Sequence, residues 1–236
     1  MADSIKREPQ LTLLSDASFF AIGGVDPAAH EYWWYGLTAE HKSRLVQTAA
    51  TKEQRKKQRA AERRVLNSGL VPININLLEL IGMVATAYVF THGRVPEYPG
   101  DSVRWLGDNQ AAVEWLKRCG GITDPRGSAV MRAAGAMMSA SLYTFEPAHI
   151  AGKKNVLADG VSRLLEQLVQ QELTRLHPGL PVWRQVALPQ VISSLISSTL
   201  AAHWQPQMPG PAQWTDMTAA GARGCCFAAS SASLPS

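Results

Sequence analysis

Residues 11–38 read LTLLSDASFFAIGGVDPAAHEYWWYGLT, and this stretch decides the class of fold. It holds apolar runs near residues 11–15, 18–22 and 31–37, and the turn formers of GGVDPAAH separate the second run from the third. Short apolar runs bounded by glycine, proline and aspartate are typical of strands joined by turns. The stretch therefore predicts two or three antiparallel strands in a meander.

Helices and strands alternate after this meander. NLLELIGMVATAYVF, residues 76–90, repeats apolar residues at helical spacing and predicts a core-facing helix with Asn76 as its N-cap. Further strands are expected at SVRWLG (102–107) and LYTFEPAHI (142–150), and further helices at 108–121, 124–139 and 155–176. The order predicts an α/β fold with a mixed sheet, an antiparallel meander followed by alternating α/β units, flanked by helices.

The same patterns divide the chain into segments. We expect a disordered N-terminus at 1–9, one domain at 10–176 with a basic helical insert at 39–66, a helical extension at 177–204 and a disordered tail at 205–236.

Positive charge is concentrated in the insert. The chain has a net charge of +4, yet residues 42–64 alone hold nine Lys or Arg and two acids. A polyanionic partner for this segment is one explanation, and a solvated charged helix is the other. The cations with which we expect the segment to contact nucleic acid are Arg55, Lys56, Lys57, Arg59, Arg63 and Arg64.

Targeting and membrane signals are missing from the sequence. The first ten residues, MADSIKREPQ, are polar, and no apolar run reaches the roughly 18 residues that a membrane span needs. The three cysteines show no metal-binding spacing. We therefore expect an intracellular protein with no membrane partner.

Four acids lie at the ends of predicted elements. Asp16 and Asp108 each follow a strand, and Glu79 and Asp159 each lie in the first turn of a helix. Each has an ordinary explanation on its own: a turn residue, an N-cap, a capping-box acid with Asn76, or a charge at a helix dipole. As a set, they can converge at one edge of a sheet, where they would repel one another unless cations bound between them. Hard oxygen ligands select Mg²⁺ or Mn²⁺, and two such ions can assist a phosphoryl transfer.

With these acids in place, the sequence resembles the ribonuclease H domain of retrotransposon reverse transcriptases, in the type 1 ribonuclease H superfamily. The similar pieces are SDAS…GG at Asp16, INLLEL at Glu79, GDNQAAVEWL at Asp108 and HIAGKKNVLADGVSR, which contains Asp159. Versions from DIRS-like and gypsy-like elements are the most similar. The resemblance covers roughly residues 10–170, and the last motif is its most specific piece.

The resemblance implies roles for individual residues. Asp16 would bridge two metal ions, Glu79 and Asp108 would hold the ion on the leaving-group side, and Asp159 would hold the ion that activates water. His149 would lie in a loop over the site and help proton transfer or product release. Asn155 would cap the helix that carries Asp159. Further contacts to nucleic acid are expected from Asn109, Lys153 and Lys154.

Three functions remain open at this point. The first is an endonuclease that cuts the RNA strand of an RNA–DNA hybrid, acting with a reverse transcriptase or recombinase of the same element. The second is a non-catalytic nucleic-acid-binding module that keeps the fold. The third is another nuclease of this fold, such as a retroviral-type integrase, although that group places a final Glu on its last helix where this chain has Asp159.

Overall fold

A mixed sheet forms the centre of the protein. The computed structural model describes residues 8–46, 51–98, 100–163, 166–176 and 182–203. Strands β1 (Leu11–Ala17), β2 (Ala21–Asp26) and β3 (Glu31–Gly36) form an antiparallel meander. The meander predicted from residues 11–38 is therefore confirmed.

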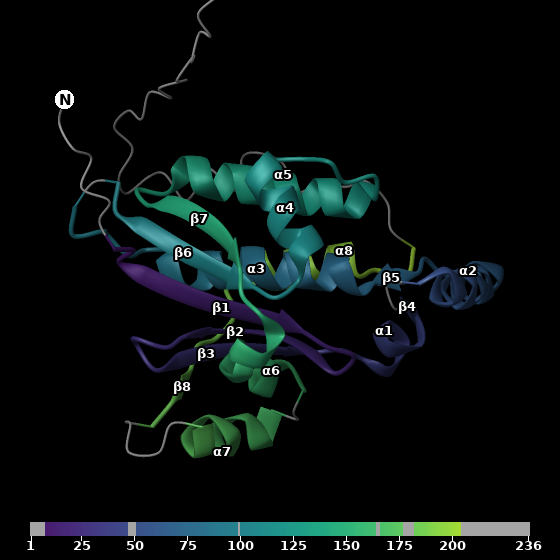
Figure 1. The fold of residues 1–236 in the computed structure, drawn as a ribbon, viewed down its shortest axis with the longest axis horizontal. Coiled ribbons are helices and arrows are strands. Elements are labelled where there is room, and N and C mark those ends of the chain that lie inside the picture. Colours follow the sequence, from purple (N-terminus) through teal and green to yellow (C-terminus); the bar gives the residue numbers. More distant parts are fainter. Residues whose placement is uncertain (1–7, 47–50, 99, 164–165, 177–181, 204–236) are drawn as a thin grey trace, which may run out of the picture.

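Three later strands extend the meander on both sides. These are β6 (Ser102–Gly107), β7 (Thr144–His149) and β8 (Arg184–Gln185), and the order across the sheet is β7-β6-β1-β2-β3-β8. Strand β6 runs parallel to both β1 and β7, and β8 runs parallel to β3. The predicted α/β fold with a mixed sheet flanked by helices is confirmed in this form (Figure 1).

Helices cover both faces of the sheet. One face packs against α3 (Ile75–Thr91), α4 (Gln110–Arg118), α5 (Pro125–Ala140) and α8 (Gln190–Thr199), and the other against α6 (Val156–Arg163) and α7 (Glu166–Leu176). Side chains alternate along a strand, so Leu13 joins the first hydrophobic cluster and Leu14 the second. A single helix was expected over residues 155–176, but the described residues there form the two helices α6 and α7.

Paired glycines in β2 let helices approach the sheet closely. A Cβ atom at Gly23 would lie 2.3 Å from a methyl carbon of Val161 in α6, and one at Gly24 would lie 2.0 Å from the hydroxyl oxygen of Thr86 in α3. Any larger residue would push one of these helices away from the sheet. The GG pair therefore sets how closely α6 and α3 approach β2.

The basic insert lies at one end of the molecule. It contains α1 (Ala39–Ser43), β4 (Leu45–Val46) and α2 (Lys52–Asn67), and β4 pairs with the short strand β5 (Ile73–Asn74). Helix α2 projects away from the sheet (Figure 1), and its six expected nucleic-acid cations are all exposed. We call α2 the basic arm.

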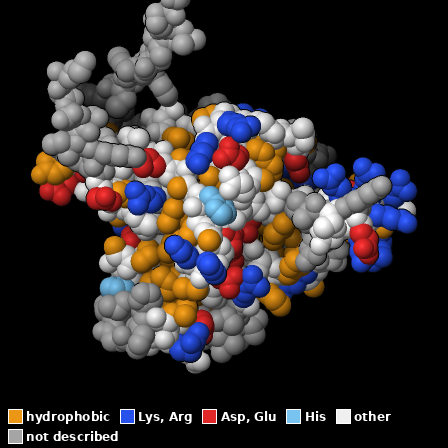
Figure 2. All heavy atoms as spheres, viewed as in Figure 1, with side chains coloured by type: hydrophobic (Ala, Val, Ile, Leu, Met, Phe, Trp, Pro, Cys, Tyr) orange, Lys and Arg blue, Asp and Glu red, His pale blue; other side chains and the backbone are white. Residues whose placement is uncertain are grey.

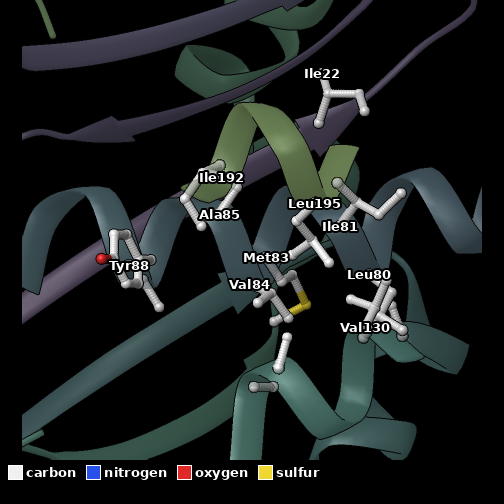
Figure 3. Packing of buried hydrophobic residues seen from close by; sticks show 14 of the residues in the cluster. Ile22, Leu80, Ile81, Met83, Val84, Ala85, Tyr88, Val130, Ile192 and Leu195 are labelled. Atoms are coloured by element: carbon white, nitrogen blue, oxygen red, sulfur yellow. The ribbon is translucent and has the colours of Figure 1, made fainter. Parts of the chain in front are cut away.

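The segment after residue 181 belongs to the core. It was expected to be a helical extension, but it also supplies strand β8 at the edge of the sheet. Ile192 and Leu195 of α8 are buried and point toward α3, beside Ile81 and Ala85 (Figure 3). Burial of this apolar face explains why the helix is held against the domain.

A buried arginine joins the insert to α8. Arg44 is fully buried, and its guanidinium donates hydrogen bonds to the carbonyl oxygens of Leu200 at 2.7 Å, Ala201 at 2.9 Å and Val71 at 2.9 Å. It also pairs with Glu40 at 3.2 Å. Since buried cations need such partners, Arg44 ties the base of the basic arm to the end of α8.

Several expectations concern residues outside this description. The N-terminus, apart from residues 8 and 9, and the tail from residue 205 both lie outside the described residues. Among the helices that are described, none has both the length and the apolar character needed to cross a membrane.

Candidate metal centre

Parallel strands bring two of the predicted acids to one edge of the sheet. In the parallel pairing of β1 with β6, Ser15 lies opposite Gly107, so Asp16 and Asp108 follow paired residues. In the pairing of β6 with β7, Gly107 lies opposite His149. Strand order alone therefore gathers Asp16, Asp108 and His149 at the same end of the sheet.

Helix α3 adds a third acid to this edge. Asp16, Glu79 and Asp108 each offer a carboxylate oxygen, and these three oxygens all lie within 4.8 Å of one another. Asp16 and Glu79 are buried, with 3% and 5% of their surfaces exposed, and Asp108 is half-buried. We call these three residues the acid triad.

Helix capping does not explain the triad. The N-cap of α3 is Asn74, whose side chain accepts a 2.8 Å hydrogen bond from the N–H of Asn76, so the prediction of Asn76 as the cap was wrong. The N-cap of α4 is Asn109, not Asp108, because the Asn109 side chain accepts from the N–H of Ala112. Neither Glu79 nor Asp108 is therefore a helix cap.

The two asparagines also tie the starts of these helices together. The Asn109 side-chain amide donates a 2.8 Å hydrogen bond to the side-chain oxygen of Asn76. This bond fixes the first turn of α3 against the first turn of α4. It therefore holds Glu79 and Asp108 at a set separation.

Burial and mutual repulsion make the triad hard to ionise. Burial raises the pKa of Asp16 to about 7, and the charges of Asp108 and Asp159 add to the rise, while a hydrogen bond from Ser162 opposes it. Burial, then Asp16 and Asp108, raise the pKa of Glu79 well above its usual range. The pKa of Asp108 is also raised, first by burial and then by Asp159. A bound cation would relieve this repulsion.

One triad atom has no hydrogen-bond partner. The Oε2 atom of Glu79 is buried and accepts no hydrogen bond within the described part of the chain. Leaving such an oxygen unpaired is unfavourable, which makes it a natural ligand for a cation. The donor set is made of carboxylate oxygens alone, the type that Mg²⁺ and Mn²⁺ prefer. The triad can therefore hold a metal ion.

The fourth acid has a different environment. Asp159 lies in the first turn of α6, as predicted, but it is not one of the three residues whose oxygens meet. Its side chain is 38% exposed, and its Oδ1 atom accepts a hydrogen bond from Nε of Arg163 one turn later in an ion pair. Asp159 is still near enough for its charge to raise the pKa values of Asp16 and Asp108, although burial contributes more.

The end of β7 and the residues after it lie against Asp108. His149 was expected in a loop, but it is the last residue of β7. A ring nitrogen of the exposed His149 is 3.1 Å from the backbone oxygen of Asp108. The 3-10 helix η1 (Gly152–Lys154) follows, and a Cβ atom at Gly152 would lie only 3.0 Å from Oδ2 of Asp108. The small residue at this position lets the loop approach the carboxylate.

Asn155 connects the start of α6 to β1 next to the acid triad. It is fully buried, and its side-chain amide donates a 3.0 Å hydrogen bond to the carbonyl oxygen of Ser15, next to Asp16. Its own carbonyl oxygen accepts from the N–H of Asp159. The side-chain oxygen of Asn155 accepts no hydrogen bond within the described residues, so the expected side-chain cap of α6 is not made. The side-chain amide instead anchors the start of α6 to β1.

The sequence alone did not single out Ser162, Arg163 or Gly152 as site residues. The hydroxyl of Ser162 donates a hydrogen bond to a carboxylate oxygen of Asp16. For Ser162 and Arg163 the available signal was spacing, because residues three and four positions after Asp159 share its face of a helix.

The expected nucleic-acid cations fall into two groups. Lys153 and Lys154 are exposed on η1 beside the triad, and the other six lie on the basic arm. Figure 2 shows acidic side chains in the middle of one face with basic side chains on either side, and a separate basic cluster over α2. Asn109, the remaining expected contact, is engaged with Asn76 and with the backbone of α4.

Comparison with known proteins found no match for this chain. The chain matches no protein-family model, and no curated protein or solved structure is significantly similar to it. The chemistry of the site must therefore be inferred from its own residues.

Proposed function

We propose that this protein is a retroelement-derived ribonuclease H-like domain that hydrolyses the RNA strand of RNA–DNA hybrids with the help of divalent metal ions. The observation that carries the proposal is the convergence of Asp16, Glu79 and Asp108 within 4.8 Å. Burial raises the pKa values of these three carboxylates. They come from β1, α3 and the end of β6, and none of them caps a helix. The motifs around them support the resemblance to that family.

The acid triad would hold a Mg²⁺ or Mn²⁺ ion, and Asp159 would complete a site for a second. Such ions, when bound, lower the pKa of water and stabilise the negative charge of a phosphoryl transfer. The contribution of the chain is to keep the ligands in place. Ser162 and Asn155 fix Asp16 and its strand, and the Asn76–Asn109 bond fixes Glu79 relative to Asp108.

Positive charge near the triad and on the basic arm supports a nucleic-acid substrate. Exposed Lys153 and Lys154 beside the triad suit phosphate groups close to the cleavage position. The basic arm would bind phosphates farther along the duplex without reading sequence. A reverse transcriptase or recombinase of the same element would supply or remove the hybrid.

One observation favours a second candidate, a non-catalytic nucleic-acid-binding module. Asp159 is paired with Arg163 and lies outside the triad. If this pair persisted in the presence of metal, the site would hold fewer ions than the proposed reaction uses. The basic surfaces would then still bind nucleic acid.

Cleavage of a labelled RNA–DNA hybrid by the purified chain, with Mg²⁺ or with EDTA, tests the proposal. We expect cleavage with Mg²⁺ only. Asp108→Asn should lower the rate by at least about 100-fold, the scale of a lost electrostatic contact to a transition state. The helix should survive this change, because Asn109 provides its cap. Cleavage by Asp108→Asn at the wild-type rate would exclude the proposed site. Binding of the hybrid by the wild type without any cleavage would favour the second candidate.

A further inference from the structure

One face of α6 is directed at the acids. Asp159, Ser162 and Arg163 occupy positions i, i+3 and i+4, which lie together on a helix. Ser162 bonds to Asp16, and Arg163 pairs with Asp159. The same turn of helix therefore contacts two of the four acids directly.

Arg163 is the arginine of this cluster, and His149 also acts on Asp108 with an opposing charge. Besides pairing with Asp159, Arg163 carries a charge that opposes the burial that raises the pKa values of Asp16, Glu79 and Asp108. The hydrogen bond with Asp159 in turn raises the pKa of Arg163 itself. Arg163 therefore partly neutralises all four carboxylates.

The pair between Arg163 and Asp159 lies at the rim of the site. The arginine side chain is 64% exposed and the aspartate side chain 38% exposed. Exposed ion pairs on helices contribute little stability, so their partners exchange readily. A divalent cation at the triad would attract the Asp159 carboxylate and repel the guanidinium.

We propose that Arg163 is an internal counter-ion that competes with the divalent cation for Asp159. Without the ion, Arg163 holds Asp159 outside the triad. When divalent cations bind at the triad, Asp159 leaves Arg163 and completes the site for the second ion. This inference rests on the proposed function, because it assigns to the same site a mechanism for admitting its metal.

Metal affinity of the whole chain tests the competition. Mg²⁺ and Mn²⁺ binding should be measured by calorimetry for the wild type, Arg163→Gln and Arg163→Lys. We expect Arg163→Gln to bind about fivefold more tightly, the equivalent of one weak surface ion pair. Arg163→Lys keeps the charge and the pairing, so its affinity should stay close to that of the wild type.

A matched control separates this effect from general loss of a helix ion pair. Arg118 of α4 pairs with Glu114 at i,i+4 with similar exposure, 76% and 33%, and lies at the other end of its helix from the triad. Arg118→Gln should leave metal affinity unchanged. Circular dichroism should show that each variant is folded.

A double-mutant cycle with Asp159→Asn separates competition for Asp159 from simple repulsion of the metal. In the Asp159→Asn background, changing Arg163 to Gln should tighten binding clearly less, because only the repulsion between the guanidinium and the metal is then removed. Equal tightening with and without Asp159 would overturn the proposal, as would unchanged or weaker binding by Arg163→Gln. Either result, with hybrid cleavage intact, would leave the proposed function standing. If the wild type did not cleave the hybrid, the proposed function would be wrong. The metal affinities of the wild type and the Arg163 variants would still test the role of Arg163.

Discussion

The buried hydroxyl of Ser162 donates a hydrogen bond to a carboxylate oxygen of Asp16, a residue 146 positions earlier in the chain. This bond joins α6 to β1 at the acid triad. It also opposes burial, which raises the pKa of Asp16 to about 7. A neutral side chain thus helps Asp16 to carry its charge.

Ser162→Ala should weaken metal binding near neutral pH. Loss of the hydrogen bond removes a contribution that lowers the pKa of Asp16, so more of the carboxylate is protonated at pH 7. We expect a loss of about fivefold in Mg²⁺ affinity at pH 7, from a net hydrogen bond of about 1 kcal/mol, with recovery near pH 9. Calorimetry across this range measures the effect. Ser128→Ala, which removes a serine hydrogen bond on α5, is the control and should change nothing.

Stability of the metal-free protein should fall as the pH rises from about 4 to about 7. The folded pKa of Asp16 is about 7, whereas its ordinary value is 3.8, so the folded chain holds the extra proton between these limits. At pH 7 and above, the raised pKa of Asp16 lowers the free energy of unfolding by at most about 4 kcal/mol. Glu79 and Asp108, whose pKa values are raised by burial first, act in the same direction.

Urea unfolding in EDTA at pH 5 and pH 8 measures this dependence. Asp16→Asn should remove much of the difference, and Mg²⁺ at pH 8 should restore stability to the wild type, because a ligand of the folded state stabilises it. A free energy of unfolding that rises between pH 5 and pH 8 in EDTA would contradict the assignment.

Gly152→Ala should disturb the triad without unfolding the protein. The added Cβ would lie 3.0 Å from Oδ2 of Asp108, so either the loop or the carboxylate must shift. We expect about tenfold weaker Mg²⁺ binding, since misplacement of one ligand weakens a metal site on the scale of its supporting contacts. Gly135→Ala is the matched control: it meets no atom within 4 Å on the exposed side of α5, and should raise stability by up to about 1 kcal/mol. Equal metal affinity in both variants would show that the loop does not constrain Asp108.

Replacing Lys56, Lys57, Arg59 and Arg63 by Gln should weaken binding of the hybrid at low salt. Each phosphate contact that is lost should flatten the log–log salt dependence of affinity by about 0.9. Cleavage at saturating substrate should change little, because the basic arm projects away from the sheet that carries the triad (Figure 1). Affinity measured at several salt concentrations, with Lys117→Gln and Arg118→Gln together as the control, tests this. An unchanged slope would leave the basic arm as a solvated helix.

Elements with a clear repeat were predictable from sequence. The apolar runs of residues 11–38 gave the meander, and the helical spacing of residues 76–90 gave α3, because burial of one face dictates these patterns. The meeting of Asp16 and Asp108 followed from their places at the ends of β1 and β6. Glu79 was expected in the first turn of its helix, but α3 begins at Ile75, so Glu79 lies one turn farther along. Strand β8 depends on its pairing with β3, far earlier in the sequence, which local patterns do not encode.

Caps and charge partners were harder to assign. Asn74 and Asn76 are both suitable N-cap residues two positions apart; Asn74 caps α3, and the side chain of Asn76 accepts a hydrogen bond from Asn109 instead. The same holds for Asp159, whose position on α6 was predictable while its pairing was not. An arginine four residues later is common on any helix, and only the neighbouring acids give Arg163 its importance.

The bonds from Arg44 to the carbonyl oxygens of Leu200 and Ala201 set an order of events during synthesis. Arg44 and Leu200 are 156 residues apart, and a ribosome adding about 5–20 residues per second needs roughly 8–30 s to make that stretch. For this time the guanidinium lacks two of its partners. The apolar surface of α3 that receives Ile192 and Leu195 also stays uncovered on the nascent chain until α8 has been made. The emerging protein should therefore be a client of chaperones that shield hydrophobic segments until translation passes α8.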